Sequence, residues 1–462
     1  MDGKPNVIVL SADSLSQAYF SDRATRLGET VDGTVFTDAV ATASDTNSAM
    51  PGLAAGVYSD TVSGWGLPEG DDRPVTLAEQ LQAVGYDCGL WTDNFLFGEE
   101  YNYTDGFDYG NAGKPTWKKS LVNVIKDYFP DAALRASEAA YFRLFKPAVN
   151  AVQSDESFYL SAEELNREAT EWLQQRSDGN YFLRIHYMDP HHPYEPPQEY
   201  VAEIEAETGF SRSELGNLSR RHIKSGGEDV TEEELAAIRA VYDASCEYLF
   251  DEVDAFVRDL VERGAFDPDE DVFVFTADHG EALNPEKHGM MGHVPPAFWE
   301  EIVNVPLVVS HPDWSPGHVD EQVSLIDLVP TVLDAAGVDV PETTEGEAAV
   351  DPLELRRETA LFVSEWRSDE GTAWNAYRGA RSESAKLFGA RLRAGDRCVA
   401  TSLTDGTETV DSDVASESDL VLSDEHEPLL AAVRERGGAV SGSGDEVDAG
   451  VEDHLRNLGY VD

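Results

Sequence analysis

The chain has 462 residues, of which 89 are Asp or Glu and 34 are Lys or Arg, so its formal net charge at pH 7 is −55. Because contacts to phosphate backbones and to anionic lipid surfaces require clustered basic residues, this charge argues against nucleic acid and acidic membranes as partners. The acidic residues are spread along the chain, and 41% of all residues are hydrophobic. We therefore expect a folded protein with an acidic surface, typical of a halophilic cytoplasm in which salt screens the self-repulsion.

The cysteine pattern and the N-terminus predict a cytoplasmic location. Cys88, Cys246 and Cys398 lie too far apart to suggest a metal-ligand pair or a disulfide framework, which fits a reducing compartment. The first residues, MDGKPNVIVLSAD, lead directly into a strand pattern without a basic or apolar leader, and no run approaches the roughly 20 apolar residues of a membrane span. The oligomeric state is left open.

The first predicted strand covers residues 6–10, NVIVL, and ends at Asp13. Open α/β sheets bind ligands in the crevice outside the carboxyl ends of their strands, which makes Asp13 a candidate ligand. Taken alone, Asp13 is more simply a turn or cap residue.

A polar segment at residues 44–48, SDTNS, precedes a predicted helix that runs towards Gly56. Hydroxyl groups before a helix N-terminus stand where backbone N–H groups favour an anion, and a hydroxyl beside a metal ion can be ionised into a nucleophile. Thr46 and Ser48 are the candidates. The alternative is that either residue merely caps the helix.

Residues 76–86 carry a cap residue, an apolar face and a terminating glycine, which predicts a helix, and residues 88–91 predict the next strand. This alternation is typical of βαβ units. Residues 110–155 have an irregular helical pattern and an unusual share of basic residues. We interpret them as a solvated helical insertion; the alternative is a lid that attracts an anionic substrate.

A third strand is predicted at residues 181–187, followed by the segment MDPHHPY. The prolines deny this segment regular structure, so its histidines are expected in a rigid loop after the strand end. His191 or His192 is the candidate for substrate contact, whereas His186, within the strand, is interpreted as a core residue. Residues 230–263 predict amphipathic helices.

Residues 272–275, VFVF, predict a buried strand that stops at Asp278 and His279. A carboxylate beside an imidazole offers an oxygen and a nitrogen ligand to a divalent cation. If this strand lies beside the strand at residues 6–10 in one parallel sheet, Asp13 and Asp278 converge. The alternative is that Asp278 caps a following helix while His279 hydrogen-bonds in a loop.

The C-terminal part begins near residue 342 with a segment rich in Pro and Glu. Strands are predicted at residues 360–363, and around 386–388 and 397–400. Residues 404–427 are dominated by Asp, Ser, Glu and Thr, which predicts a mobile acidic loop. Short helices are expected at residues 429–436 and 454–458.

Taken together, the motifs resemble the sulfatase family of the alkaline phosphatase superfamily. They occur in the family's order along nearly the whole chain: NVIVLSADS, TLAEQLQAVGYD, HYMDPHHPY, VFVFTADHGE, HGMMGH and SLIDLVPTVLDAAGV. The resemblance implies an α/β fold with a mixed, mostly parallel central sheet sandwiched between helices and a smaller C-terminal α+β domain. It implies a catalytic domain at residues 1–341, with the helical insertion at about 110–160, and a C-terminal domain at 342–462.

The resemblance also implies a metal site and a set of catalytic residues. The ligands of one divalent metal ion would be Asp13, Thr46, Asp278 and His279. Thr46 matches the nucleophile position, His191 the residue that faces the leaving-group oxygen, and His293 the residue on the transferred group. His288 is a secondary candidate, with a surface loop role as its alternative.

Three departures from the family pattern change the expected chemistry. Sulfatases convert a Cys or Ser within C/S-x-P/A-x-R to formylglycine, whereas residues 46–50 here are TNSAM. The resemblance to threonine-dependent relatives therefore favours phosphoester cleavage or transfer over sulfatase chemistry. Ser14 stands in place of a paired aspartate, and His279 in place of an asparagine. The imidazole favours Zn²⁺ or Mn²⁺, with Ca²⁺ or Mg²⁺ possible.

We therefore expect a metal-dependent hydrolase of sulfate or phosphate esters, acting on a small molecule or a glycan. One alternative is a catalytically silent protein that keeps the fold and serves in binding or regulation. The other is a soluble phosphotransferase that acts on glycans or lipid headgroups.

Overall fold

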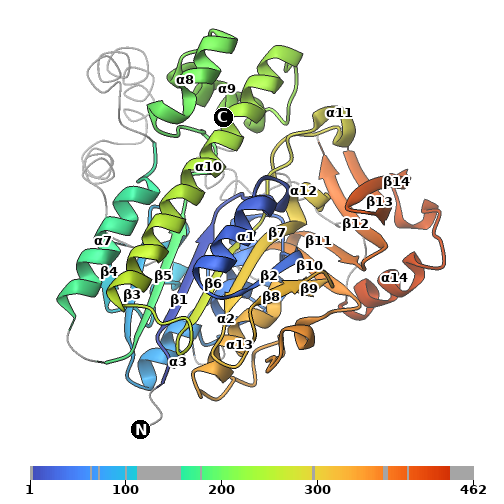
Figure 1. Cartoon of the computed structure of the whole chain (residues 1–462). Helices are drawn as coiled ribbons and strands as arrows, with labels where there is room; N and C mark the ends of the chain where they lie inside the picture. The colour runs from blue at the N-terminus through green and yellow to red at the C-terminus, as the bar shows by residue number, and fades with distance from the viewer. Residues whose placement is uncertain are drawn as a thin grey trace, which may run out of the picture.

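A computed structural model describes residues 4–62, 65–70, 73–98, 101–111, 158–176, 179–293, 297–367, 373–392 and 395–437. Within these ranges the protein contains a nine-stranded central sheet between helices and a separate five-stranded antiparallel sheet (Figure 1). This confirms the predicted α/β fold with a smaller C-terminal α+β part. The predicted insertion at 110–160 lies almost wholly outside the described residues, and the predicted helix at 454–458 lies entirely outside them.

The central sheet is mixed and mostly parallel, with the order β4-β3-β5-β1-β6-β7-β2-β8, and β9 pairs with β2. Its strands are β1 (Val7–Ala12), β2 (Thr34–Val40), β3 (Asp87–Thr92), β4 (Tyr109–Gly110), β5 (Tyr181–Tyr187), β6 (Val272–Ala277), β7 (Asn304–Ser310), β8 (Gly317–Val319) and β9 (Val323–Ser324). Only β7 runs against its neighbours, β6 and β2.

The three central strands end at the same level of the sheet. β1 pairs in parallel with β5 on one side and with β6 on the other, so Ala12 lies opposite both Tyr187 and Ala277. Every residue of these three strands is buried, as expected for parallel strands that are covered on both faces. The residues that follow β1 and β6, including Asp13 and Asp278, therefore emerge at one edge, as the sequence predicted.

Helices cover both faces of the central sheet (Figure 1). One layer contains α1 (Ser21–Thr30), α7 (Ala162–Gln175) and α10 (Glu232–Arg263), and the other contains α2 (Thr46–Ala55), α3 (Leu77–Ala83) and α13 (Leu328–Ala335). The remaining helices are α8 (Gln198–Thr208), α9 (Arg212–Lys224), α11 (Pro285–His288), α12 (Glu300–Val303) and α14 (His426–Glu435). None of the helices within the described ranges is long and apolar enough to cross a membrane.

Capping residues explain where the helices begin. The helix predicted at 76–86 is α3, whose N-cap Thr76 forms a capping box with Glu79. The amphipathic pattern at 230–263 forms a single helix of 32 residues, α10, which begins after a capping box of Thr231 and Glu234. It ends at Gly264, whose φ of 66° is readily adopted by glycine.

The second sheet corrects one prediction about the C-terminal part. Its strands, in order, are β10 (Ala360–Arg367), β11 (Ala373–Arg381), β12 (Ala385–Leu392), β13 (Gly395–Thr404) and β14 (Thr407–Val414). The mobile acidic loop predicted at 404–427 is wrong, because β14 pairs with β13 and α14 begins at His426. The expected helix at 429–436 is confirmed as α14. The domain boundary predicted at residue 342 stays a prediction.

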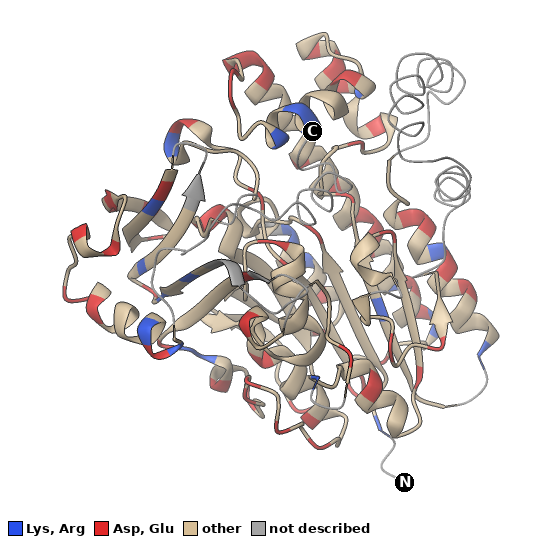
Figure 2. Ribbon diagram, turned by 180° about the vertical axis from the view of Figure 1, so that it is seen from behind, with Lys and Arg blue, Asp and Glu red and all other residues tan. Residues whose placement is uncertain are grey.

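The distribution of charged residues and the state of the cysteines agree with the expectations from the sequence. Figure 2 shows Asp and Glu on helices and loops all around the protein, with few Lys and Arg between them. Cys88, Cys246 and Cys398 are buried free thiols, in line with the expectation that they form no disulfide.

Candidate metal and active site

Four of the predicted site residues meet where β1 and β6 end. Asp13 follows β1, Asp278 and His279 follow β6, and Thr46 is the first residue of α2. All four side chains are buried, and Thr46 is the most accessible of them at 7% exposure. A site built after strand ends on a continuous sheet is held in place by the backbone pairing beneath it.

Thr46 is oriented towards the carboxylate of Asp13. Its hydroxyl donates a hydrogen bond to Asp13 Oδ2 at 3.1 Å and lies 3.2 Å from His279 Nε2. The N-cap of α2 is Asp45, whose carboxylate accepts hydrogen bonds from the backbone N–H and the hydroxyl of Ser48. The alternative in which Thr46 caps the helix is therefore wrong, and its hydroxyl faces the site at a helix N-terminus.

Asp278 and His279 each direct one ligand atom, Oδ2 and Nε2, to this space. His279 Nδ1 lies 2.9 Å from the carbonyl oxygen of Gly280, and we assign the proton to Nδ1, which leaves a lone pair on Nε2. Asp278 Oδ1 accepts from the backbone N–H groups of Ser14 and His279. Asp278 Oδ2 lies 3.6 Å from His279 Nε2 and finds no hydrogen-bond donor among the described residues.

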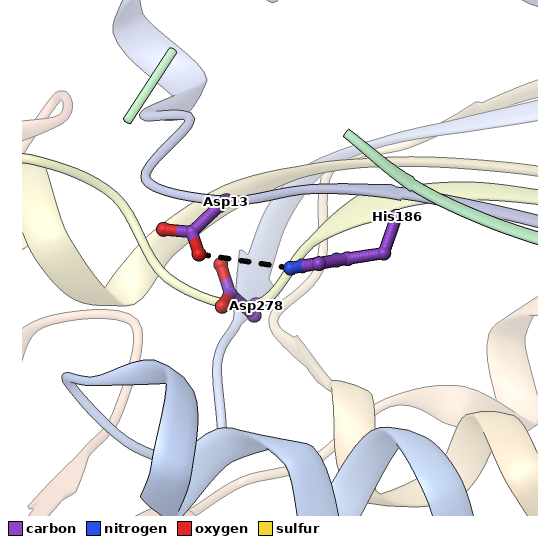
Figure 3. Close-up of side chains that lie close together, drawn as sticks. All are labelled: Asp13, His186 and Asp278. Carbon is purple, nitrogen blue, oxygen red and sulfur yellow. Dashed lines mark ion pairs between the residues drawn. The ribbon is translucent and has the colours of Figure 1, made fainter. Parts of the chain in front are cut away.

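The sequence predicts His186 as a core residue, and the structure places it against the same carboxylates. The side chain is fully buried, and its Nε2 lies 3.6 Å from Asp13 Oδ2. Figure 3 shows the ring of His186 directed at Asp13 and Asp278. One ligand atom from each of these three residues lies within 4.8 Å of the other two.

Two further histidines lie beside this cluster. The ring of His293 has its centroid 4.5 Å from that of His279, and His191 lies 5.6 Å from His293. His191 Nδ1 faces the hydroxyl of Tyr159 at 3.1 Å, and its ring stacks on His192. His191 and His293, predicted as catalytic residues, are thus grouped next to the candidate metal ligands.

The family assignment follows from comparison with known proteins. The family model for sulfatases matches residues 5–338. The chain belongs to the sulfatase family. Among its relatives are an uncharacterized sulfatase, YidJ, of Escherichia coli (strain K12), 26% identical over 322 residues, and the multifunctional alkaline phosphatase superfamily protein PehA of Trinickia caryophylli, 25% identical over 240 residues. These matches cover 65% and 47% of this chain, and 60% and 43% of the relatives' lengths.

Solved structures share the fold of this sulfatase-family chain. The phosphonate monoester hydrolase of Agrobacterium radiobacter aligns with a TM-score of 0.61 at 21% identity, covering 87% of this chain and 89% of that structure. The phosphonate monoester hydrolase SpPMH from Silicibacter pomeroyi aligns with a TM-score of 0.60 at 18% identity, covering 94% of both chains. At these identities the likeness concerns the fold alone.

The two carboxylates of this sulfatase-family site fit a metal ion. Burial, and then the nearby charge of Asp13, raise the pKa of Asp278 to about 7. Burial alone would also raise the pKa of Asp13, but the neighbouring histidines, His191 foremost, hold it well below its usual value. The pair therefore resists carrying two negative charges by itself. A divalent cation between the carboxylates would offset the repulsion between their charges. The unpaired Oδ2 of Asp278 also indicates a cation site.

Glu281, which the sequence analysis did not single out, controls the charge of His293. Its Oε1 lies 3.0 Å from His293 Nδ1, and its Oε2 accepts a hydrogen bond from the hydroxyl of Tyr194. Burial would lower the pKa of His293, but the Glu281 carboxylate outweighs burial and raises it to about 9. Burial lowers the pKa of His191, so that imidazole is neutral at pH 7. The site thus combines a cationic and a neutral histidine.

Two other residues change the predicted picture. Asn94, which follows β3, donates from Nδ2 to Asp13 Oδ2 at 3.0 Å and was not predicted.

His288, the secondary candidate, instead pairs with Glu301 at 3.2 Å and stacks on Trp299. The sequence offers one signal for His186 that could have been used: it is the penultimate residue of a strand whose end was already assigned to the site.

Proposed function

We propose that this sulfatase-family protein is a metal-dependent esterase that cleaves phosphate or phosphonate esters in preference to sulfate esters, with Thr46 as its nucleophile. One observation carries the proposal: the Thr46 hydroxyl lies at a helix N-terminus, between the carboxylate of Asp13 and the imidazole of His279. The loop also lacks the residues that formylglycine formation requires. Two solved structures that share the fold are named phosphonate monoester hydrolases, so the fold is compatible with phosphorus ester chemistry.

Asp13, Asp278 and His279 would hold one divalent metal ion beside Thr46. Such an ion would supply Lewis-acid chemistry, which lowers the pKa of a hydroxyl group and offsets charge that develops on a transferred group. Because the set includes an imidazole, Zn²⁺ or Mn²⁺ is favoured over Ca²⁺ or Mg²⁺.

The protein's own residues account for the two chemical steps. Thr46 Oγ1 gives up its proton along one of its hydrogen bonds and forms a bond to phosphorus, while the bond from phosphorus to the alcohol oxygen breaks. The departing oxygen takes up the proton that Thr46 releases, and the neutral imidazole of His191 assists by donating a hydrogen bond to that oxygen. Water then attacks the phosphothreonine at phosphorus, and the bond from phosphorus to Thr46 Oγ1 breaks. That oxygen takes up a proton from the attacking water, which releases phosphate or phosphonate and restores Thr46.

His293 and the N-terminus of α2 would stabilise the transferred group. The pKa of about 9 keeps His293 cationic at neutral pH, next to His279 and with its ring centroid 5.6 Å from that of His191. A fixed positive charge and helix N–H groups favour the oxyanions that carry more charge in the transition state.

The test compares aryl esters of phosphate, phosphonate and sulfate in about 2 M KCl, a concentration that screens the acidic surface. We expect turnover of the phosphorus esters that depends on Mn²⁺ or Zn²⁺. Thr46→Ala should lower kcat by at least about a thousandfold, whereas Thr46→Ser should retain part of the activity. The matched control is Ser48→Ala, because Ser48 lies on the same helix turn but bonds to Asp45 rather than to the site.

Acid quenching with mass spectrometry should detect a phosphate group on Thr46 in the wild type. A preference for the sulfate ester, or full activity in Thr46→Ala, would contradict the proposal. No turnover of any ester by folded, metal-loaded protein would favour the alternative of a catalytically silent binding protein.

A further inference from the structure

We infer that His186 Nε2 is an additional ligand of this metal site, so that the ion is held by two carboxylates and two imidazoles, from Asp13, Asp278, His279 and His186. The inference rests on the proposed function, because it takes the ion at Asp13 and Asp278 as given. It adds a ligand from β5, a strand to which the sequence assigned no metal-binding role.

The first argument is that two buried ligand atoms in the same cluster have no hydrogen-bond partner. Within the part of the chain that the structure describes, neither His186 Nε2 nor Asp278 Oδ2 has one. Both side chains have 0% exposure, so water in bulk does not compensate. A buried polar atom left unpaired is costly, and the great majority of such atoms in proteins have partners. Two unpaired ligand atoms in one cluster indicate that they share a partner, and a bound cation would be such a partner.

The second argument is distance. His186 Nε2 lies 3.6 Å from Asp13 Oδ2, which is too long for a hydrogen bond. Two ligands bound to one ion at about 2.1 Å lie roughly 3.0 to 3.6 Å apart at tetrahedral or octahedral angles. The side chains of Asp13, His186 and Asp278 lie close together (Figure 3), and their ligand atoms lie within 4.8 Å of one another. Small side-chain rotations would therefore allow all three to bind one ion.

The third argument is the orientation of the ring. Ser11 Oγ lies 2.9 Å from His186 Nδ1, and Ser11 is directly opposite His186 in the pairing of β1 with β5. When Nδ1 donates to Ser11, Nε2 carries the lone pair that a metal requires. His279 has the same arrangement, with Nδ1 on the carbonyl oxygen of Gly280. Metal-binding histidines typically donate their second ring nitrogen in this way, which fixes the tautomer and the ring.

The added imidazole has a consequence for the choice of metal. Two nitrogen and two carboxylate ligands suit Zn²⁺, Mn²⁺ and other transition metals, whereas Ca²⁺ and Mg²⁺ prefer oxygen ligands alone. His186 would therefore strengthen binding of a transition metal relative to Ca²⁺.

The test counts the imidazole ligands directly and does not use activity. Metal-free protein is loaded with one equivalent of Mn²⁺, and histidine nitrogen couplings are counted by pulsed EPR. We expect two couplings in the wild type and one in each of His186→Asn and His279→Asn. The affinity for Mn²⁺ should fall at least about tenfold in His186→Asn. The control is His288→Asn, a buried histidine that pairs with Glu301, which should keep both couplings and the wild-type affinity.

The outcomes separate this inference from the function on which it rests. A single coupling in the wild type that disappears in His279→Asn would remove His186 from the site and leave the proposed function standing. No Mn²⁺ bound by folded wild type overturns both. If His186→Asn does not unfold cooperatively, and so is not natively folded, the His279→Asn variant decides the question. One nitrogen coupling in His279→Asn supports His186 as a ligand, and no coupling refutes it.

Discussion

Asp13 is the residue on which the contacts of the site converge. Its Oδ2 accepts hydrogen bonds from Thr46 and Asn94, and its Oδ1 accepts one from Ser14. The sequence predicted Asp13 because a carboxylate after a buried strand is a local signal. Asn94 carries no such signal, since its contact depends on β3 lying one strand away from β1 across β5, which is a property of the sheet order.

His186 shows a different limit of sequence reasoning. A histidine inside a buried strand was assigned to the core, and the residue is indeed fully buried. Burial and ligation do not exclude each other, however, and only the pairing of β5 with β1 places the ring beside Asp13. The sequence could not distinguish a satisfied core histidine from one with an open ligand atom.

At the residue scale, we expect Asn94→Ala to weaken metal binding by about tenfold to a hundredfold. The amide donates to the same oxygen of Asp13 that receives Thr46, so its loss leaves that carboxylate less well oriented. Competition with a chelator measures the affinity for Mn²⁺. Asn217→Ala serves as the control, because Asn217 is exposed on α9 and bonds only locally to the carbonyl oxygen of Ser213. Equal affinity in the two variants would show that Asn94 has no part in positioning Asp13.

At the scale of elements, the sequence predicted the central strands well but not β14. Its residues are mostly acidic and hydroxyl-bearing, and the composition indicated a loop. The burial pattern explains the error, since Glu408 points inward and its Oε1 pairs with Lys386 at 2.7 Å. From the sequence alone, Glu408 is predicted to be a surface residue. Its burial is predictable only if Lys386, which lies 22 positions earlier on β12, is known to be its neighbour.

Lys386 joins the second sheet to the helix that precedes β7. Its side chain is fully buried, and its Nζ also lies 2.8 Å from Glu300 Oε1 on α12. Arg381 holds the same glutamate from β11. Burial alone would raise the pKa of Glu300, but Lys386 and then Arg381 outweigh burial and lower it to about 2.

We therefore expect Lys386→Met to lower the free energy of unfolding at pH 7 by about 3 kcal/mol, because it leaves the buried carboxylate of Glu408 and the largely buried carboxylate of Glu300 short of positive charge. The pKa of Glu300 falls from 4.5 to about 2 on folding, so its ionised pair contributes stability above pH 4.5 and loses it as the pH falls towards 2. The difference between variant and wild type should narrow over that interval. Urea unfolding across a pH series measures it.

The control for this prediction is Lys287→Met, which removes an exposed lysine on α11. A surface change of this kind should alter stability by less than about 0.5 kcal/mol. If Lys386→Met lowers the free energy of unfolding by no more than Lys287→Met does, the ion pairs of Lys386 do not stabilise the contact between α12 and the second sheet.

At the scale of the whole molecule, the order of motifs was enough to predict the fold, whereas the site required the fold itself. Asp13, His186 and Asp278 are spread over more than half the chain and come together because β5, β1 and β6 are adjacent and end at the same level of the sheet. The motif order fixes which strands exist, and the parallel pairing then determines which strand ends share an edge.

The charge of the whole molecule leads to the last prediction. Acidic residues are distributed over the helices and loops (Figure 2), and a net charge of −55 destabilises a compact state through self-repulsion. The Debye length shortens from about 10 Å at 0.1 M salt to about 3 Å at 1 M, so KCl should screen this repulsion. We expect the midpoint of thermal unfolding to rise by on the order of 10 °C between about 0.1 and 2 M KCl. At a pH near 5, closer to the isoelectric point of about 4.3, the rise should be smaller, because protonation removes part of the charge. A midpoint that does not change with KCl at pH 7, or that changes equally at both pH values, would contradict this prediction. It would show that repulsion among the acidic residues does not make the stability of the fold depend on salt.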